Sequence, residues 1–361
     1  MSWTTVDLFC GAGGTSLGLK ETNLEVRAAI DNDEVACQVY DNYLPADTYQ
    51  ADLTETSIDD VCDYYGMNTN EIDVIVGCPP CQNFSTLRRT TPWREGEPKD
   101  ELLVSFVDLI LEASPGVVIF ENVEGILKSD DGQYIEWFNE WMRKAGYGVA
   151  LRVVDAADYG VPQRRKRAIG ICVHGVRDEE IKFPEPTHAA PNEATSSEKK
   201  PWRTVREAIG NLPVIESGET SSMDGHQARN HQSNTLDIIR AVPEDGGSRA
   251  DIPDELELDC HKRLDDGEAR NVYGRMAWDE PAPTLTTRCT NASSGRFIHP
   301  KQHRAITLRE AARLMTFPND FSFPEHRKHA SRLIGNAVPP TLMETLVNGF
   351  LNQNENLLSR T

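Results

Sequence analysis

A cysteine loop is the segment of this sequence with the clearest chemical potential. It reads Gly-Cys-Pro-Pro-Cys-Gln-Asn-Phe-Ser over residues 77–85 and directly follows the apolar run 72–76. A thiolate is a strong nucleophile, and the carboxyl end of a strand is where open α/β sheets bind ligands. Cys81, placed by two prolines, is therefore the candidate nucleophile. Cys10 and Cys172 fit the alternative of a buried structural cysteine better than Cys81 does.

The spacing of Cys78 and Cys81 leaves two other chemistries open. A C-x-x-C pair can be half of a zinc site or a redox pair. No second C-x-x-C follows in the chain, so the sequence disfavours structural zinc and predicts no metal site. A C-x-x-C oxidoreductase remains an alternative, and it requires both thiols to be reactive.

A carboxyl group and a run of cations stand beside two further predicted strands. Glu121 follows the apolar run 117–120, where a partly desolvated carboxyl suits an acid or a hydrogen-bond donor. Residues 164–167 are four consecutive cations before the apolar run 168–173, so alternate side chains can face a ligand. A surface cap and a solvated charge run are the respective alternatives.

A glycine-rich turn and an acid point to a cofactor. Gly11 and Gly13 follow a predicted strand that ends at Phe9, and they lead into a predicted helix. Glycines at this place let a ligand approach the backbone closely. Asp31 ends the next predicted strand about twenty residues on, where an acid commonly accepts ribose hydroxyls. A tight turn and a helix cap remain alternatives, but together the two features favour a cofactor that contains a nucleoside.

Positioning these groups requires a parallel sheet with crossover helices, and the first ~180 residues have that pattern. Short apolar runs predict strands at 6–9, 26–30, 72–76, 117–120 and 168–173. From about residue 182, prolines and polar residues mark a linker, and 201–300 has little regular periodicity. We expect an α/β fold with a doubly wound, mostly parallel Rossmann-like sheet in a domain of residues 1–185 and 331–361. Residues 186–330 form a second, smaller irregular domain in this interpretation.

The charge of the chain bears on its partner and its location. With 37 Lys and Arg against 57 Asp and Glu, the net charge is −20, which at first argues against a polyanionic partner. Residues 286–332 contain nine Lys and Arg but only three Asp and Glu, so the negative net charge of the whole chain does not exclude DNA as a partner. No apolar run approaches the roughly 20 residues that span a bilayer, and no secretory signal opens the chain. We therefore expect a cytoplasmic, nucleoid-associated protein with reduced cysteines.

In motif order and over nearly its full length, the chain resembles the DNA (cytosine-5)-methyltransferases. The segments that carry the resemblance are Asp7–Gly14, Cys78–Ser85, Glu121-Asn122-Val123, Gln163–Arg167, Arg304–Leu314 with Phe317-Pro318, and Gly335–Pro340. The resemblance implies methyl transfer from S-adenosylmethionine to cytosine C5. It also implies double-stranded DNA as the substrate, with the target base flipped out of the duplex. A cognate restriction endonuclease, acting on the same site without a stable complex, is a possible partner.

The resemblance also assigns roles to residues. Cys81 is implied as the nucleophile, Glu121 as the group that engages the cytosine ring edge, and Arg165 as a ring-oxygen and loop contact. The implied cofactor residues are Phe9 against the adenine, Asp31 on the ribose, Asp52 on the base, and Gly11, Gly13, Pro80, Leu102 and Asn336 around them. Residues 186–330 are the implied target-recognition domain. Candidate DNA contacts are Arg167, Arg288 and Arg296, together with Arg275.

Two rival functions share parts of this pattern. A tRNA cytosine-5-methyltransferase uses much of the same catalytic core, but the sizeable region before Thr284 favours DNA. A catalytically inactive relative that only binds S-adenosylmethionine or DNA has no need of a nucleophile, so the presence of Cys81 and Glu121 argues against it.

Overall fold

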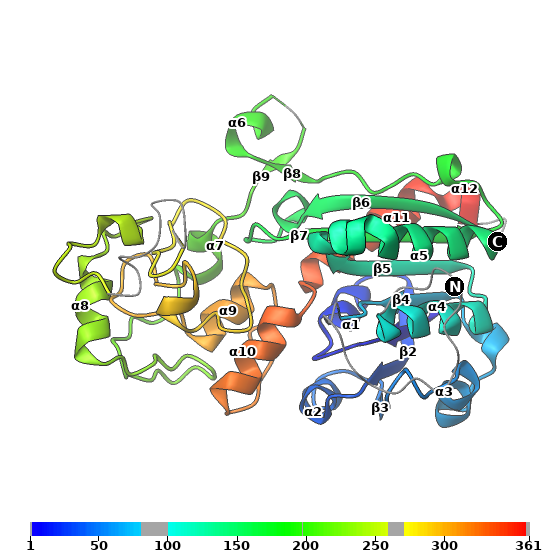
Figure 1. The fold of residues 1–361 in the computed structure, drawn as a ribbon, viewed down its shortest axis with the longest axis horizontal. Coiled ribbons are helices and arrows are strands. Elements are labelled where there is room, and N and C mark those ends of the chain that lie inside the picture. The colour runs from blue at the N-terminus through cyan, green and yellow to red at the C-terminus, as the bar shows by residue number, and fades with distance from the viewer. Residues whose placement is uncertain (1, 81–99, 197, 259–270, 359–361) are drawn as a thin grey trace. The chain divides into compact units, whose positions relative to one another are not determined.

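The computed structural model of the protein describes residues 2–80, 100–196, 198–258 and 271–358. The chain divides into two compact units, whose elements are labelled in Figure 1. Unit 1 comprises Met1–Asp155, Lys166–Pro186 and Pro340–Thr361, and unit 2 comprises Ala156–Arg165 and Thr187–Pro339. No helix in the described part of the chain is both long and apolar enough to cross a membrane.

Unit 1 is built on a seven-stranded sheet with the order β3-β2-β1-β4-β5-β7-β6. Its strands are β1 (Trp3–Leu8), β2 (Leu24–Asp31), β3 (Thr48–Gln50), β4 (Val74–Gly77), β5 (Val117–Val123), β6 (Tyr147–Asp155) and β7 (Lys166–His174). Strands β1 to β5 pair in parallel, whereas β7 pairs antiparallel with β5 and β6. The chain runs outward from β1 through β2 and β3, and then in the other direction through β4 and β5. Ligands of such sheets bind where the order reverses, at the carboxyl ends of β1 and β4.

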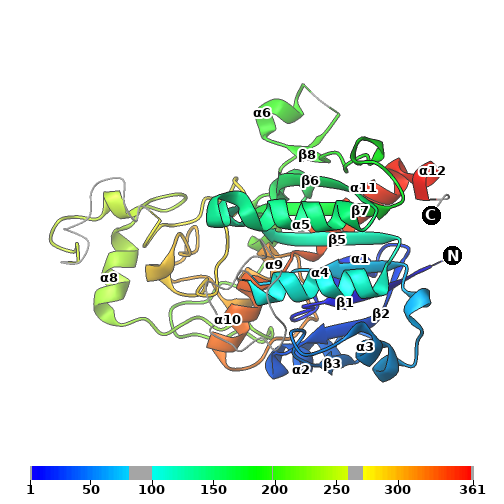
Figure 2. The same cartoon turned by 45° about the vertical axis from the view of Figure 1, so that its right-hand side comes forward.

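Helices lie on both sides of this sheet (Figures 1 and 2). They are α1 (Gly14–Leu19), α2 (Glu34–Asp41), α3 (Ile58–Tyr65), α4 (Glu101–Ala113), α5 (Gln133–Lys144), α11 (Pro340–Gln353) and α12 (Glu355–Leu358). Helices α3, α4 and α5 share one apolar core with the sheet, in which Phe106, Phe120 and Phe138 are all fully buried. Helix α1 packs against α11. The doubly wound α/β sheet that the sequence predicted is confirmed.

Helix α4 illustrates how the sequence produces these elements. Asp100 caps its first turn by accepting a 3.2 Å hydrogen bond from the Leu103 amide. Leu103, Phe106, Val107 and Ile110 then recur at helical spacing and are buried against the sheet. The capping acid and the periodic apolar face therefore fix where the helix begins and which side it buries.

Unit 2 has short elements and long irregular connections. Its elements are β8 (His188–Ala189), α6 (Pro191–Ala194), β9 (Lys200–Pro201), α7 (Val205–Ile209), α8 (Ser233–Ala241), α9 (Leu308–Leu314) and α10 (Arg327–Asn336). Irregular backbone leaves buried carbonyl groups without partners in a helix or sheet, and these need other donors. Fully buried arginines supply them: Arg275 donates to carbonyls of Ile239, Val242, His299 and Gln302.

The two units differ from the expected domains at Pro186, which belongs to unit 1 rather than to the second domain, and in two longer segments. Residues 331–339 and the loop 156–165 belong to unit 2, whereas the sequence placed both in the first domain. The physical reason is Arg165, whose guanidinium donates to the carbonyls of Leu285, Gly335 and Ala337 at 2.9–3.0 Å. This single side chain ties the loop to the end of α10.

Candidate active site

The glycine turn follows β1 and is fixed to the end of β2. Its backbone is left-handed at Phe9, Gly11 and Gly13, with φ of 61°, 54° and 87°. A Cβ atom at Gly13 would lie 2.3 Å from Leu44 Cδ1, so only glycine fits there without displacement. The Gly11 amide donates to the Asp31 carboxylate at 2.9 Å. The sequence-predicted pair of glycine turn and strand-end acid is therefore in direct contact.

A buried carboxyl group lies next to this turn. Asp7 of β1 is fully buried, and its Oδ2 accepts a 2.5 Å hydrogen bond from the Ser16 hydroxyl. The Tyr40 hydroxyl in turn donates to Ser16 at 2.8 Å. Burial raises the pKa of Asp7 to about 7, the Ser16 hydrogen bond opposes the shift, and the charge of Asp31 adds to it. The chain of hydroxyls links α1 and α2 to β1, and Asp7 titrates near neutral pH.

Two expected cofactor acids follow adjacent strand ends. Strands β2 and β3 end side by side, and the Ala51 amide donates to the Asp31 carbonyl at 3.1 Å. Asp52 follows directly, and its Oδ1 accepts from the amide and the hydroxyl of Thr54 at 2.9 and 2.8 Å. Both carboxylates are thus held at the same edge of the sheet.

The remaining expected cofactor residues divide between the units. Phe9 packs edge-on against Phe106 with ring centroids 6.3 Å apart, and Leu102 lies partly exposed in the first turn of α4. Pro80 is exposed at the end of a described stretch, so Cys81, the candidate nucleophile, lies outside the described residues. Asn336 is an exposed residue at the end of α10 in unit 2.

Glu121 is held at the end of β5 between a cation and a thiol. Its carboxylate forms an ion pair with Arg167 Nε of β7 at 2.8 Å, and the two side chains are only 9% and 10% exposed. The Cys78 thiol lies near enough to Glu121 for the two groups to influence each other's charge, and its sulfur lies 3.8 Å from the Thr15 hydroxyl. Burial, followed by the charges of Glu121 and Asp7, raises the pKa of Cys78 well above its usual value. Cys78 is therefore a neutral thiol rather than a nucleophilic thiolate.

The neighbour of Glu121 anchors the cysteine loop. Asn122 Nδ2 donates to the Pro79 carbonyl at 2.8 Å, and both groups are buried. Sequence reasoning used Asn122 only as part of a motif and did not foresee this bond. It links the end of β5 to the loop that leads to Cys81.

The two candidate arginines have different environments. The expected base contact, Arg165, is 1% exposed in unit 2, and three carbonyl groups occupy its guanidinium. Arg167, which the sequence analysis named as a candidate DNA contact, is the one paired with Glu121. Arg167, and not Arg165, is therefore the cation that contacts the Glu121 carboxylate among the described residues.

Comparison with known proteins gives the family. A family model described as C-5 cytosine-specific DNA methylase matches residues 3–351. The chain belongs to this family. It is 38% identical to the type II methylase M.HgiDII of Herpetosiphon aurantiacus over 348 residues, and this alignment covers 95% of this chain and 93% of that protein. The resemblance inferred from the motifs is confirmed, and so is the enzyme class.

Solved structures agree with the fold. One is a candidate DNA modification methyltransferase encoded in an E. coli prophage, with a TM-score of 0.67, 25% identity and coverage of 97% of this chain and 99% of that one. Another is the S. pombe Dnmt2 methyltransferase, with a TM-score of 0.58, 15% identity and coverage of 97% and 99%. The latter likeness is one of fold alone.

The arginines that were expected to contact DNA in this methylase differ in their exposure and in their internal hydrogen bonds. Arg288 is exposed. Arg296 Nη1 donates to the carbonyls of Gly246, Gly247 and Arg275 at 2.8–2.9 Å, so it fastens a loop. Arg275 was wrong as a DNA contact, because it is fully buried among carbonyl groups.

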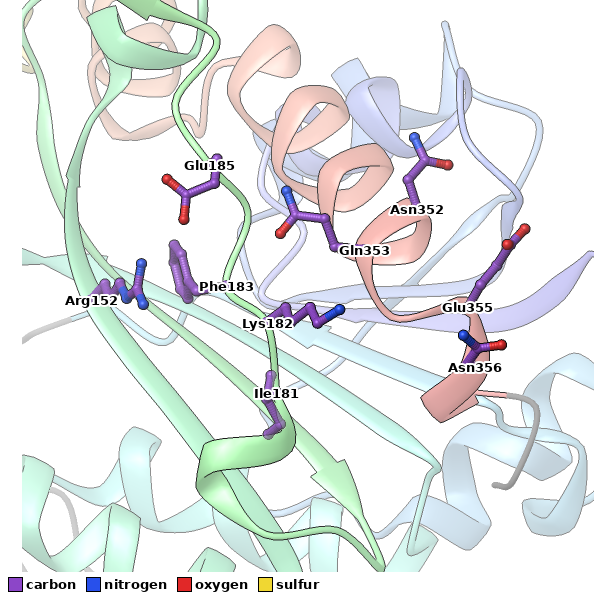
Figure 3. A pocket seen from close by; sticks show the side chains of 9 residues that line it. All are labelled: Arg152, Ile181, Lys182, Phe183, Glu185, Asn352, Gln353, Glu355 and Asn356. Atoms are coloured by element: carbon purple, nitrogen blue, oxygen red, sulfur yellow. The ribbon is translucent and has the colours of Figure 1, made fainter.

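A cavity of about 680 Å³ opens elsewhere in unit 1 (Figure 3). It lies between β6, the segment 181–185 and the helices α11 and α12, and the Arg152 guanidinium stacks over the Phe183 ring at 5.0 Å. The lining includes Lys182 and Gln353 but neither Cys78 nor Glu121. This cavity is therefore separate from the strand ends of β1, β4 and β5 that carry the methylase motifs.

Proposed function

We propose that this methylase transfers a methyl group from S-adenosylmethionine to C5 of a cytosine flipped out of duplex DNA, through a covalent bond between Cys81 Sγ and cytosine C6. The observation that supports it best is the buried pair of Glu121 and Arg167. It lies at the end of β5, beside the β4 loop that leads to Cys81, and Asn122 joins the two. An acid, a cation and a nucleophile are the groups that attack on a cytosine ring requires.

The residues at the ends of β1, β2 and β3 fit the proposed cofactor. S-adenosylmethionine supplies an electrophilic methyl group on a sulfonium cation. The acids Asp31 and Asp52 suit ribose hydroxyls and the base, and Phe9 offers an aromatic face. Asp7 Oδ1 is buried and has no hydrogen-bond partner among the described residues, which suits a site that receives a cation. Gly11 and Gly13 would hold the cofactor by their backbone.

The proposed steps require only groups of this chain around the base. Cytosine C5 is a poor nucleophile, and addition of the Cys81 thiolate at C6 moves electron density onto C5. Glu121 would engage N3 and the amino edge, while Arg167 would donate to the ring carbonyl oxygen as charge develops there. After C5 takes the methyl group, loss of the C5 proton breaks the S–C6 bond and restores the aromatic ring. Flipping the base costs a few kcal/mol.

We assign this chemistry to unit 1 and recognition of the target sequence to unit 2. Thr284 and Leu285 of unit 2 bond to the loop that precedes Arg165: the Thr284 hydroxyl donates to the Arg164 carbonyl, and the Leu285 amide donates to Gln163 Oε1. This contact joins the two motifs within unit 2. We further propose that a restriction endonuclease acts on the same DNA site, as the type II naming of M.HgiDII suggests for that protein.

A mechanism-based trap tests the proposal. Duplex DNA carrying 5-fluorocytosine blocks the loss of the C5 substituent, so the full-length protein should form a stable covalent adduct in the presence of S-adenosylmethionine. Cys81→Ser should abolish the adduct and Cys78→Ser should retain it. Loss of the adduct in Cys78→Ser alone would refute the assignment of the nucleophile. An adduct with fluorinated tRNA but not with DNA would transfer the substrate assignment to RNA.

A further inference from the structure

A second cavity in unit 1, which we call the β2 pocket, has a volume of about 220 Å³. It lies between the start of β2, the end of α1 and the segment that follows α2. The remaining lining residues are exposed or half-buried and surround its opening, whereas its floor is formed by the buried residues Ser16, Leu24, Tyr40 and Leu44. The lining residues differ from those that the proposed function uses, so the β2 pocket is distinct from the proposed cofactor and cytosine sites.

Two floor residues of the β2 pocket also support the glycine turn. A Cβ atom at Gly13 would collide with Leu44 Cδ1 and lie 3.0 Å from Tyr40 Cδ2, so both side chains lie directly against the backbone of the turn. The Tyr40 hydroxyl donates to Ser16 at 2.8 Å, and the Ser16 hydroxyl donates to the buried carboxyl group of Asp7. The floor of the pocket is thus in contact with the turn and with the strand that leads into it.

The lining of the β2 pocket favours an uncharged, mostly apolar occupant. Leu24, Leu44 and the ring of Tyr40 make its floor apolar. Its charged lining residues, Lys20 and Glu25, are exposed. A charged group placed at the floor would lose its hydration, which is costly. An apolar cavity of about 150 Å³ is large enough to hold benzene, so the volume of this pocket is sufficient for an aromatic ring.

The hydroxyl groups at the floor define the polar contact that a ligand can make. Tyr40 donates its hydroxyl hydrogen to Ser16, and Ser16 donates its own to Asp7. Because both hydrogens are used within the protein, the hydroxyl oxygens remain only as acceptors. A ligand that forms a hydrogen bond here must therefore bring an N–H or O–H donor.

We propose that the β2 pocket binds a small, uncharged aromatic molecule with a single N–H or O–H donor, and that this ligand strengthens the binding of the cofactor. The second part rests on the proposed binding of S-adenosylmethionine at the glycine turn. Side chains that border an unfilled space lack dispersion contacts on that side. A ligand restores these contacts for Leu44 and Tyr40 and holds both side chains against Gly13. By linkage, the cofactor raises the affinity for the ligand by the same factor.

Calorimetry with indole as the probe tests this site. Indole is uncharged and aromatic, and it carries a single N–H donor. Coupling between two binding sites typically changes affinity roughly 5–150-fold, and we expect saturating indole to lower the Kd of the full-length protein for S-adenosylmethionine about fivefold. N-methylindole, which lacks the donor, should bind more weakly than indole, and indole-2-carboxylate, which adds a charge, should not bind. Binding of either analogue as tightly as indole would overturn the assigned ligand class.

A variant that fills the β2 pocket separates this site from binding elsewhere. Ala46 lines the pocket, and Ala46→Leu should abolish both the binding of indole and its effect on the cofactor. Ala194→Leu makes the same change at a half-buried residue of α6 in unit 2 and should retain both. Thermal unfolding shows whether each variant folds like the wild type, and Val26→Phe fills the same pocket if Ala46→Leu does not fold.

The outcomes distinguish the pocket from the proposed function. Three results would each overturn the inference and leave the proposed function standing: indole that does not bind the wild-type protein, indole binding that survives in Ala46→Leu, and indole binding that leaves the Kd for S-adenosylmethionine unchanged. Failure of the wild-type protein to bind S-adenosylmethionine, with or without indole, would overturn the coupling and the proposed function together.

Discussion

The pair formed by Glu121 and Arg167 makes the sharpest prediction, because stability and catalysis respond to it differently. The two charges are 2.8 Å apart and about one-tenth exposed. Removing one partner of a buried pair leaves an uncompensated charge, which costs about 3–5 kcal/mol. Since these side chains keep some solvent contact, we expect Arg167→Met to lower the free energy of unfolding by about 3 kcal/mol. Adding Glu121→Gln removes the orphaned charge and should restore most of that loss.

Catalysis should not recover in the double variant. Loss of a donor that stabilises developing charge lowers kcat about 10²–10³-fold. Urea denaturation measures the first effect, and single-turnover transfer of a tritiated methyl group measures the second. Arg143→Met is the control, because Arg143 pairs with Asp178 at 2.8 Å but both side chains are about half exposed. Such a surface pair contributes at most about 1 kcal/mol and should leave activity intact. Full activity in Arg167→Met would refute the catalytic role, and an unchanged unfolding free energy would refute the buried pair.

Three further predictions concern the residues around this pair. Gly13→Ala should weaken the binding of S-adenosylmethionine measured by calorimetry, because φ is 87° at this position and a Cβ atom would lie 2.3 Å from Leu44 Cδ1. Gly66→Ala is the matched control and should bind normally, because φ is 62° there and a Cβ atom would meet open space. Burial raises the pKa of Asp7 to about 7, so its contribution to the free energy of unfolding should be complete below about pH 4 and should be lost as the pH rises through 7. Asp7→Asn should therefore make the free energy of unfolding depend less on pH over this window, and equal pH profiles for the two proteins would contradict this. Asn122→Ala should slow covalent trapping and leave cofactor affinity unchanged, because it removes the hydrogen bond to the Pro79 carbonyl that anchors the cysteine loop. Trapping at the normal rate would show that this hydrogen bond does not position the loop.

The sequence was sufficient for strands β1, β2, β4, β5 and β7, but it did not predict the two edge strands, β3 and β6. Strands β1, β4 and β5 are short, largely buried and rich in branched apolar residues, and β2 contains the buried run 28–30, so these strands stand out in the sequence. Strand β6 lies at the edge of the sheet, and the exposed Arg152 in its middle interrupts the apolar run. Its pairing with β7 is a long-range contact that no local pattern records.

The sequence could not separate Arg165 from Arg167 as the partner of Glu121, for a similar reason. In a continuous strand, residues two apart face the same side, so strand alternation alone does not separate the two arginines. The chain passes from unit 2 to unit 1 between residues 165 and 166, and β7 begins only at Lys166. Alternation therefore does not apply across that point. Which arginine meets Glu121 depends on the register of β7 against β5, where Arg167 lies opposite Val123.

The count of cations was a poor guide to the DNA-binding surface for a physical reason. An irregular domain has many buried carbonyl groups, and arginine is the side chain that can donate to several of them at once. Of the cations between 286 and 332, Arg296, Arg304, Arg309 and Arg313 are committed to internal carbonyl, amide and carboxylate groups. Their charges stabilise unit 2 and do not face a ligand. A cation's place in a basic run is thus not enough to identify it as a phosphate contact, because internal carbonyl and carboxylate groups compete for it.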